Sequence, residues 1–392
     1  MKRLRYKKNI CLVTSSRADY DLMSKLINLF KRDNRINFTL LITGQHLSKK
    51  YGYTYKSIIK KHRKNSKKID IKVNKANKLS ILNSMSNVLK DVGKYLYSKK
   101  IDLLVVLGDR YETTSIALAA YINQIKIAHI HGGEKTTGSM DDSFRHVITK
   151  LSNLHFVSAK KYKDRVAQLG EEKKDIHVVG GLGSEMINDM VLLNKKKIES
   201  KIKIKFNKRN FLIGVNSYLN QNESEEKLMK NIFQSIKKFK DTNYIFTLPN
   251  SDVNSDKISK LIYKFNKSNS NSYIFKNLGS HLYISLMKYC DAVIGNSSSG
   301  ILEAPVIKIP TVNIGKRQDG RLKSTSIINS KTSYKDIFKS IKKSLSNNFK
   351  KKIIKTKNIY FQKKTSEKIL NIIASINLKK LSYKEFKDIK LK

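Results

Sequence analysis

The sequence is poor in cysteine, proline and tryptophan: its 392 residues include two Cys, three Pro and no Trp. Cys11 and Cys290 both lie in short apolar runs, which is typical of buried core thiols and argues against a disulfide framework or a zinc site. No apolar run approaches the roughly 18 residues that a membrane-spanning helix needs. The run ICLV near the N-terminus is also too short for a secretory signal. These absences predict a cytoplasmic protein with no membrane partner.

Acidic residues are scarce as well: 31 Asp and Glu stand against 80 Lys and Arg, so the formal net charge is +49. Such an excess can indicate binding to nucleic acid. Here the lysines are spread along the whole chain together with abundant Asn and Ile, a pattern that we attribute to AT-rich coding bias. We therefore expect no nucleic-acid partner, although the positive charge can still attract an anionic substrate.

The chain is long enough for two sizeable domains, and apolar segments alternate with amphipathic ones, which predicts an α/β protein with mostly parallel strands. We expect two Rossmann-like, doubly wound domains that face each other across a cleft, residues 1–185 and 186–392. The lysine-rich residues 50–80 give no clear prediction, residues 195–210 are predicted to form a charged linker, and the chain beyond Ile327 is predicted to be helical.

Polar residues follow the first four strands predicted in the first half. They are Arg17 and Asp19, then His46, then Asp109 and Arg110, then His131 and Glu134, and finally Asp141, Asp142, Arg145 and His146 at the start of a helix. Open α/β sheets bind ligands at the carboxyl ends of their strands. Neighbouring carboxylates and imidazoles there are suited to acid/base chemistry. A helix cap or a solvated loop is the alternative interpretation for any single member of this set.

The second half carries a phosphate-type pattern between Asp291 and Arg321. The strand DAVIG runs into a turn of small residues, with Ser297, Ser298, Ser299 and Gly300, and then into a short helix with Glu303. Such a turn favours anions, a carboxylate on the first helical turn can bind a ribose diol, and the following loop offers Arg317 and Arg321. An ordinary strand–turn–helix connection with a solvated Arg loop is the alternative.

Seven motifs in order, SSRADY, TGQHL, LGDRYE, HIHGGE, DDSFRHVITKLS, IGNSSSGILEAP and NIGKRQDGR, resemble the hydrolysing UDP-N-acetylglucosamine 2-epimerases, which include bacterial sialic- and legionaminic-acid enzymes. The resemblance implies a glycosyltransferase-B-like arrangement, with a late helix near residues 355–375 that returns to the first domain. It also implies elimination of the nucleotide to give a 2-acetamidoglucal, followed by hydration to a free manno-configured sugar. This reaction requires neither a metal nor a redox cofactor.

The resemblance and the strand-end positions together predict the roles of the site residues. The predicted catalytic residues are Asp109, His131, Glu134, Asp141, Asp142, Arg145 and His146; the predicted nucleotide-binding residues are Arg17, Ser297, Ser298, Ser299, Gly300, Glu303, Arg317 and Arg321; and Asp19, His46 and Arg110 are predicted to line the substrate pocket. The expected partner is a nucleotide sugar, and a homodimer or homotetramer is expected.

The sequence departs from the family pattern at three places. His131 stands where several members have Glu, Asn216 and Ser217 stand near the position of a family His, and Asp21 replaces a common Gly. Two other functions stay open at this point: a glycosyltransferase of the same architecture, and a nucleotide-sugar-binding protein without turnover.

Overall fold

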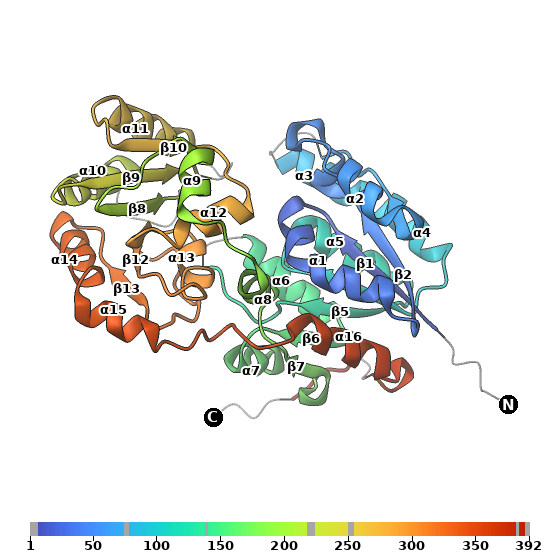
Figure 1. Cartoon of the computed structure of the whole chain (residues 1–392). Coiled ribbons are helices and arrows are strands. Elements are labelled where there is room, and N and C mark those ends of the chain that lie inside the picture. Colours follow the sequence, from blue (N-terminus) through green and yellow to red (C-terminus); the bar gives the residue numbers. More distant parts are fainter. Residues whose placement is uncertain are drawn as a thin grey trace. The chain divides into compact units, whose positions relative to one another are not determined.

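The computed structural model describes residues 7–73, 78–137, 140–217, 224–249, 255–381 and 384–388, and the chain divides into two compact units (Figure 1). The first unit comprises Met1–Glu134, Ser139–Glu185 and Gln362–Lys392, and the second comprises Lys135–Gly138 and Met186–Phe361. The predicted segment after the first strand of the second half runs into residues 218–223, which lie outside the described residues.

The first unit is built on a parallel seven-stranded sheet of order β3-β2-β1-β4-β5-β6-β7. Its strands are β1 (Lys8–Thr14), β2 (Ile36–Ile42), β3 (Ser66–Lys68), β4 (Leu103–Leu107), β5 (Lys126–Ile130), β6 (Leu154–Val157) and β7 (Ile176–Val178). Its helices are α1 (Arg17–Arg32), α2 (Tyr55–His62), α3 (Lys78–Asn87), α4 (Gly93–Tyr97), α5 (Tyr111–Ile122), α6 (Met140–Leu151), α7 (Lys160–Gln168) and α16 (Thr365–Ser375), with a π-helical turn at Val88–Val92 between α3 and α4.

Both faces of this sheet are buried against apolar cores. Alternate residues of a strand point to opposite faces, so neighbouring residues enter different cores. Ile10 and Leu12 of β1 belong to one apolar core, whereas Cys11 and Val13 belong to the core on the other face. This explains why the strands appear in the sequence as continuous apolar runs.

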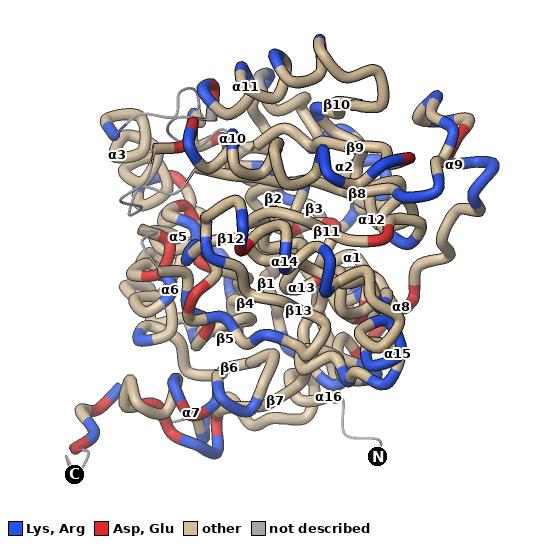
Figure 2. The backbone as a smooth tube through the Cα atoms, turned by 90° about the vertical axis from the view of Figure 1, so that its left-hand side faces the viewer, with Lys and Arg blue, Asp and Glu red and all other residues tan. Residues whose placement is uncertain are grey.

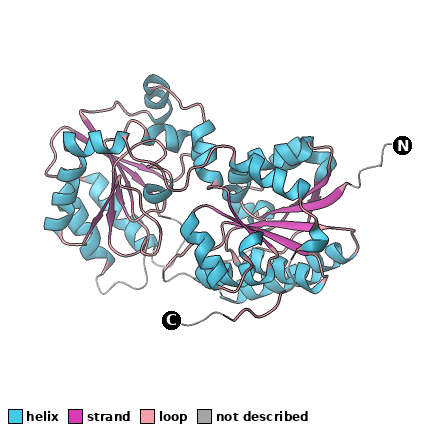
Figure 3. Ribbon diagram, turned by 90° about the horizontal axis from the view of Figure 1, so that it is seen from below, coloured by secondary structure: helices cyan, strands magenta, loops and turns pink. Residues whose placement is uncertain are grey.

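The second unit has a parallel six-stranded sheet of order β10-β9-β8-β11-β12-β13. Its strands are β8 (Arg209–Gly214), β9 (Thr242–Thr247), β10 (Ser272–Phe275), β11 (Ala292–Gly295), β12 (Thr311–Ile314) and β13 (Ile327–Ser330). Its helices are α9 (Lys195–Ile202), α10 (Glu225–Ile236), α11 (Ser255–Lys267), α12 (Ser280–Met287), α13 (Ser299–Leu302), α14 (Tyr334–Ser344) and α15 (Asn347–Ile354), and α8 (Leu182–Asp189) runs from the first unit into the second. Figure 3 shows helices on both faces of each sheet. The prediction of two Rossmann-like domains is confirmed.

Two predictions about secondary structure were wrong. Residues 195–210 do not form a linker, because Ile198 and Ile202, four residues apart on α9, are buried in the core of the second unit. The chain beyond Ile327 is not helical throughout, since it first adds the edge strand β13 to the sheet. Residues 50–80, which the sequence left without a clear prediction, contain α2, β3 and the start of α3.

The last helix belongs to the first unit, where α16 packs on α1. Ile369 and Ile373 lie in the same core as Met23. The carboxylate of Glu185 fixes this arrangement: it accepts a hydrogen bond from the backbone N–H of Ser366 at 3.0 Å and pairs with Lys25 at 3.1 Å.

The charged residues are distributed along both units and do not gather on a single element (Figure 2). Within the described part of the chain, none of the helices combines the length and the apolar character that crossing a membrane would require.

Candidate functional site

The loop after β1 is shaped by a capping box at the start of α1. Ser16 is the N-cap and Asp19 is the residue at the third helical position. The Asp19 carboxylate accepts hydrogen bonds from the backbone N–H groups of Ser15 at 2.9 Å and of Ser16 at 2.8 Å, and from the hydroxyl of Thr14 at 3.1 Å. Asp19 therefore fixes the loop that carries the exposed Arg17 at the first position of the helix.

His46, in the loop after β2, contacts the end of β1 and so supports the loop that follows it. Its side chain is fully buried, with Nε2 2.9 Å from the Thr14 hydroxyl and Nδ1 2.7 Å from the Thr54 hydroxyl. Burial lowers the pKa of His46, which favours the neutral imidazole. With both ring nitrogens occupied, His46 orients the Thr14–Asp19 turn, and its predicted place in the substrate pocket stays a prediction.

Asp109 follows β4 in a turn that is held by a histidine from the next strand. Gly108 has a φ of +83°, which a glycine adopts without strain. His129 Nε2 lies 2.8 Å from the Gly108 carbonyl oxygen, and its Nδ1 lies 3.2 Å from the Thr149 hydroxyl. Because burial lowers the pKa of His129 to about 3, the imidazole is neutral and donates a hydrogen bond to Gly108. His129 thus positions the turn that presents Asp109.

Arg145 links the carboxylates of this edge into one cluster. The residue lies on α6, its side chain is 2% exposed, and it is among the largest fully buried side chains. Its Nη2 donates to Asp109, and its Nη1 donates to Asp142 Oδ1 at 2.7 Å and to the Glu134 carbonyl at 2.9 Å. Burial alone would lower the pKa of Arg145, but the charges of Asp109, Glu134 and Asp142 raise it. We call Arg145, Asp109, Asp142 and Glu134 the acid cluster.

His131 and Glu134 lie on the tight loop after β5. The φ of His131 is +69°, a conformation that residues other than glycine adopt mainly at special positions. His131 Nε2 accepts a hydrogen bond from the Leu182 N–H at 3.4 Å, and its Nδ1 lies 3.6 Å from Glu134 Oε1. A Cβ on Gly133 would lie 2.4 Å from the Tyr162 carbonyl, so the loop requires glycine there.

The remaining predicted residues of the first unit are neighbours in sequence of Asp109, Asp142 or Arg145. Arg110 binds the buried carboxylate of Glu112 with two hydrogen bonds of 3.1 and 2.8 Å, which leaves its side chain 35% exposed. His146 Nε2 lies 3.7 Å from Asp142 Oδ2, one turn further along α6. Asp141 is exposed on the first turn of α6.

In the second unit, two glycines allow β8 and β11 to end side by side. Gly295, with a φ of +133°, pairs with Gly214, and a Cβ on Gly295 would lie 2.1 Å from the Gly214 carbonyl. The following Asn296 is 1% exposed and exchanges hydrogen bonds of 2.7 and 2.8 Å with the backbone of Asn216. The turn with Ser297 and Ser298 is therefore rigidly placed at the carboxyl ends of two adjacent strands.

The helix after this turn is only one turn long, since α13 ends at Leu302. The Ser299 hydroxyl lies 2.7 Å from the Tyr283 hydroxyl. Burial raises the pKa of Glu303, and a hydrogen bond with Ser299 opposes that shift. Burial and the nearby Glu303 also raise the pKa of Tyr283. A Cβ on Gly300 would lie 2.6 Å from Thr311 Cγ2, which explains the glycine.

The loop after β12, Lys316–Arg321, which we call the Arg loop, lies against the serine turn, Ser297–Ser299. Arg317 Nη1 and Gln318 Nε2 both donate to the Asn296 carbonyl, at 3.2 and 2.8 Å. Arg321 Nη2 donates to the Thr136 hydroxyl at 3.4 Å, while its Nε and Nη1 are buried without an acceptor in the structure. The serine turn and the Arg loop are thus brought together, and this loop presents unused guanidinium donors.

Contacts therefore join the predicted residues into three groups: Asp19 and His46 at the turn that carries Arg17, the acid cluster with its neighbours, and, in the second unit, the serine turn with the Arg loop. Sequence reasoning missed His129, Tyr283 and Gln318, whose contribution depends on burial and on contacts with distant residues. The one signal in the sequence was the alternation of side chains along the strand HIHGGE, which places the side chains of His129 and Ile130 on opposite faces of the sheet. Among the described residues, no group of three or more His, Cys, Asp or Glu side chains is arranged to hold a metal ion.

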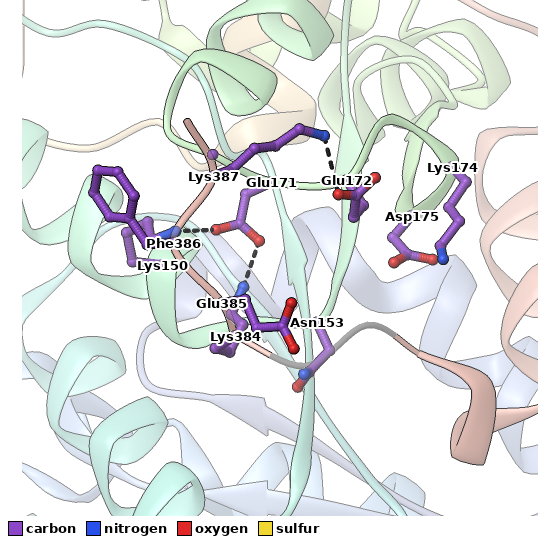
Figure 4. A pocket seen from close by; sticks show the side chains of 11 residues that line it. Lys150, Asn153, Glu171, Glu172, Lys174, Asp175, Lys384, Glu385, Phe386 and Lys387 are labelled. Carbon is purple, nitrogen blue, oxygen red and sulfur yellow. Dashed lines mark hydrogen bonds and ion pairs between the residues drawn. The ribbon is translucent and has the colours of Figure 1, made fainter. Parts of the chain in front are cut away.

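A hollow of about 320 Å³ in the first unit is lined by none of the predicted residues (Figure 4). The carboxylate of Glu171 lies at its centre and pairs with Lys150 at 2.9 Å, with His155 at 3.0 Å and with Lys384. Burial alone would raise the pKa of Glu171, but His155 and Lys384 lower it to about 2. Together with the ion pair between Lys387 and Glu172, the contact with Lys384 ties residues 384–387 to the rest of the first unit.

The chain is similar in sequence and in fold to known proteins. The chain is 38% identical to the GDP/UDP-N,N'-diacetylbacillosamine 2-epimerase (hydrolyzing) of Campylobacter jejuni, with 98% of this chain and 100% of that protein covered. It is 35% identical to the polysialic acid biosynthesis protein P7 of Escherichia coli, over 97% of this chain and 98% of that one. The fold is similar to the crystal structure of UDP-GlcNAc 2-epimerase from Neisseria meningitidis bound to UDP-GlcNAc, with a TM-score of 0.78 at 18% identity, over 93% of this chain and 99% of that one. Residues 28–374 match the model of the UDP-N-acetylglucosamine 2-epimerase family, and the chain belongs to this family.

Proposed function

We propose that this protein is a hydrolysing 2-epimerase that converts a nucleoside-diphosphate 2-acetamido sugar into the free manno-configured sugar and the nucleoside diphosphate. The observation that carries the proposal is the acid cluster at the strand ends of the first unit, in a chain that belongs to the epimerase family. The product would serve the synthesis of sialic- or legionaminic-type acids, and the name of one relative, polysialic acid biosynthesis protein P7, supports the first of these.

The reaction requires a base for a weakly acidic C–H bond. In the first step the base takes the proton from C2, the C1–O bond breaks, and the bonding electrons leave with the diphosphate, which gives a 2-acetamidoglucal. In the second step water adds its hydroxyl group to C1, and C2 is protonated from the opposite face. Positioned carboxylates and imidazoles can perform both proton transfers.

We assign the first proton transfer to Asp109. Its side chain is 28% exposed, compared with 19% for Asp142 and 10% for Glu134, so it is the most accessible carboxylate of the cluster. Arg145 fixes its orientation, which reduces the reorganisation that catalysis requires. Nδ1 of His131 lies 3.6 Å from Oε1 of Glu134, and these two residues are suited to activating water and returning the proton.

The leaving diphosphate would be bound by the second unit. Ser297, Ser298 and Ser299 offer hydroxyl and backbone donors, and the buried Nε and Nη1 of Arg321 lack an acceptor. Guanidinium groups bind phosphate oxygens in a planar fork. With its raised pKa, Glu303 retains a proton to higher pH and can donate to, or accept from, a ribose hydroxyl.

The proposal is tested by incubating the protein in deuterium oxide with UDP-N-acetylglucosamine and, separately, with the UDP- and GDP-linked 2,4-diacetamido-6-deoxy sugar. Proton and phosphorus NMR should show nucleoside diphosphate and a manno-configured sugar that carries deuterium at C2. Asp109→Asn should abolish both signals. Release of no nucleoside diphosphate, or a product without deuterium at C2, would refute the proposal.

A second candidate is a protein that binds a nucleotide sugar without turnover. It is favoured by the absence of the family His near Asn216, where Ser217 donates to Glu225. Binding of UDP without any product in the same experiment would support this alternative.

A further inference from the structure

The segment Lys135–Thr137 connects the two groups of site residues. The chain leaves the first unit after Glu134, residues Lys135–Gly138 belong to the second unit, and the chain then returns to the first at Ser139. The Thr137 hydroxyl donates to the Asp319 carbonyl at 2.8 Å. Because Asp319 belongs to the Arg loop, Lys316–Arg321, this hydrogen bond fixes the segment to that loop.

Two neighbouring residues reinforce the contact. Gly320 has a φ of +88°, and a Cβ at this position would lie 2.8 Å from Lys135 Cδ, so the stem of Lys135 lies directly on the glycine. Arg321 Nη2 donates to the Thr136 hydroxyl at 3.4 Å. Three consecutive residues of the segment therefore contact three consecutive residues of the Arg loop.

The Arg loop is in turn bound to the serine turn. Arg317 and Gln318 both donate to the carbonyl oxygen of Asn296, the residue that precedes the serines. Asp319, which accepts from Thr137, directly follows Gln318. A nucleotide diphosphate that binds at the turn and the loop would therefore act on the residues that hold the segment.

The other end of the segment leads directly to the acid cluster. Arg145 Nη1 donates to the Glu134 carbonyl at 2.9 Å and to Asp142 at 2.7 Å. Only Lys135 and Thr136 lie between Glu134 and Thr137. One residue of extended chain spans about 3.3–3.6 Å, so a link this short can absorb little displacement.

We propose that Thr137 is a positioning residue, whose hydrogen bond to the Arg loop couples nucleotide binding in the second unit to the geometry of the acid cluster. This inference rests on the proposed function. In this proposal Thr137 takes no direct part in the proton transfers or in binding the diphosphate, and it acts through the Glu134 carbonyl and Arg145.

The first test compares Thr137→Val, which removes the hydroxyl at nearly constant shape, with Thr137→Ser, which keeps it. A misplacement of about 1 Å can cost a factor of about 100 in rate. We expect Thr137→Val to lower kcat by about 10- to 100-fold, with KM and the Kd for UDP changed by less than about threefold. Thr137→Ser should stay within about threefold of the wild type in all three quantities.

The second test does not depend on turnover. Hydrogen–deuterium exchange of the second turn of α6 is measured with and without UDP for the wild type and both variants. UDP should slow the exchange in the wild type and in Thr137→Ser, whereas in Thr137→Val it should bind with unchanged Kd and leave the exchange unaltered.

The coupling is overturned if Thr137→Val matches the wild type in kcat and in exchange, if UDP has no effect on α6 in the wild type, or if UDP does not bind. Failure of the proposed function gives a different result, because no nucleoside diphosphate would then be released from any of the sugars. If UDP still protects α6 in the wild type but not in Thr137→Val, the coupling is supported even in that case.

Discussion

Replacement of Arg145 by methionine should damage both the stability and the activity of this protein. The guanidinium group is 2% exposed and donates to Asp109, to Asp142 and to the Glu134 carbonyl. Methionine is similar in length but leaves the two carboxylates facing each other without the cation between them. Breaking a buried ion pair by removing one partner costs about 3–5 kcal/mol, because the remaining charge is buried without compensation.

The matched control is Arg35→Met. Arg35 makes a similar two-pronged contact with Asp33, at 2.9 and 2.6 Å, but its side chain is 37% exposed. Exposed ion pairs contribute at most about 1 kcal/mol. Urea unfolding followed by circular dichroism should therefore show a loss about 2–4 kcal/mol larger for Arg145→Met than for Arg35→Met.

Activity gives the second measurement. Because Arg145 orients Asp109, we expect Arg145→Met to lose about 100-fold or more in kcat, while Arg35→Met remains close to the wild type. Arg145→Lys keeps the charge, but a single ammonium lacks the planar fork, so it should recover only part of the loss. The reasoning is refuted if Arg145→Met is no less stable than Arg35→Met, or if it retains full activity.

Two further predictions concern single positions. Gly295→Ala should destabilise the second unit by about 1–3 kcal/mol or more and weaken UDP binding, because its Cβ would meet the Gly214 carbonyl. The control is Gly279→Ala, where φ is +69° but nothing lies within 4 Å of the added Cβ. Equal losses of stability for the two variants in urea unfolding would contradict the argument. Because the pKa of Glu171 is lowered from 4.5 to about 2, the folded state binds fewer protons than the unfolded state in this range, so the stability that its contacts provide is complete above pH 4.5 and is lost as the pH falls toward 2. Glu171→Gln should lower the free energy of unfolding at neutral pH and flatten its decline between pH 4.5 and 2, whereas an unchanged acid-unfolding curve would show that the contacts with His155 and Lys384 contribute nothing.

Much of the fold could be predicted from the sequence, because buried parallel strands produce continuous apolar runs with polar residues at their ends. The core strands on either side of β1 and β8 lie where such runs occur. The errors fall on short or lysine-rich elements. The lysines of α9 hide two buried isoleucines, and β13 has only four residues.

The candidate site was predictable in part for the same reason. Parallel strands bring their carboxyl ends to one edge, so Asp109, Glu134 and Asp142 could be expected to lie close together. Their precise relation could not be expected, since it depends on the buried Arg145, which lies on α6, 36 residues beyond Asp109. In the same way, the sequence suggested Asp19 and His46 as pocket residues, but it could not show that Asp19 accepts hydrogen bonds from the turn after β1 or that His46 joins that turn to Thr54.

The sequence by itself determined the two α/β domains, the polar strand ends and the family, because each of these is encoded in local patterns and ordered motifs. Only the tertiary structure decided which strand-end residues share a proton or a charge, that His129 is neutral and holds the Asp109 turn, and that Thr137 is fixed to the Arg loop. The physical reason is that hydrogen bonds and burial depend on the distance between atoms in space, whereas the sequence records only their separation along the chain.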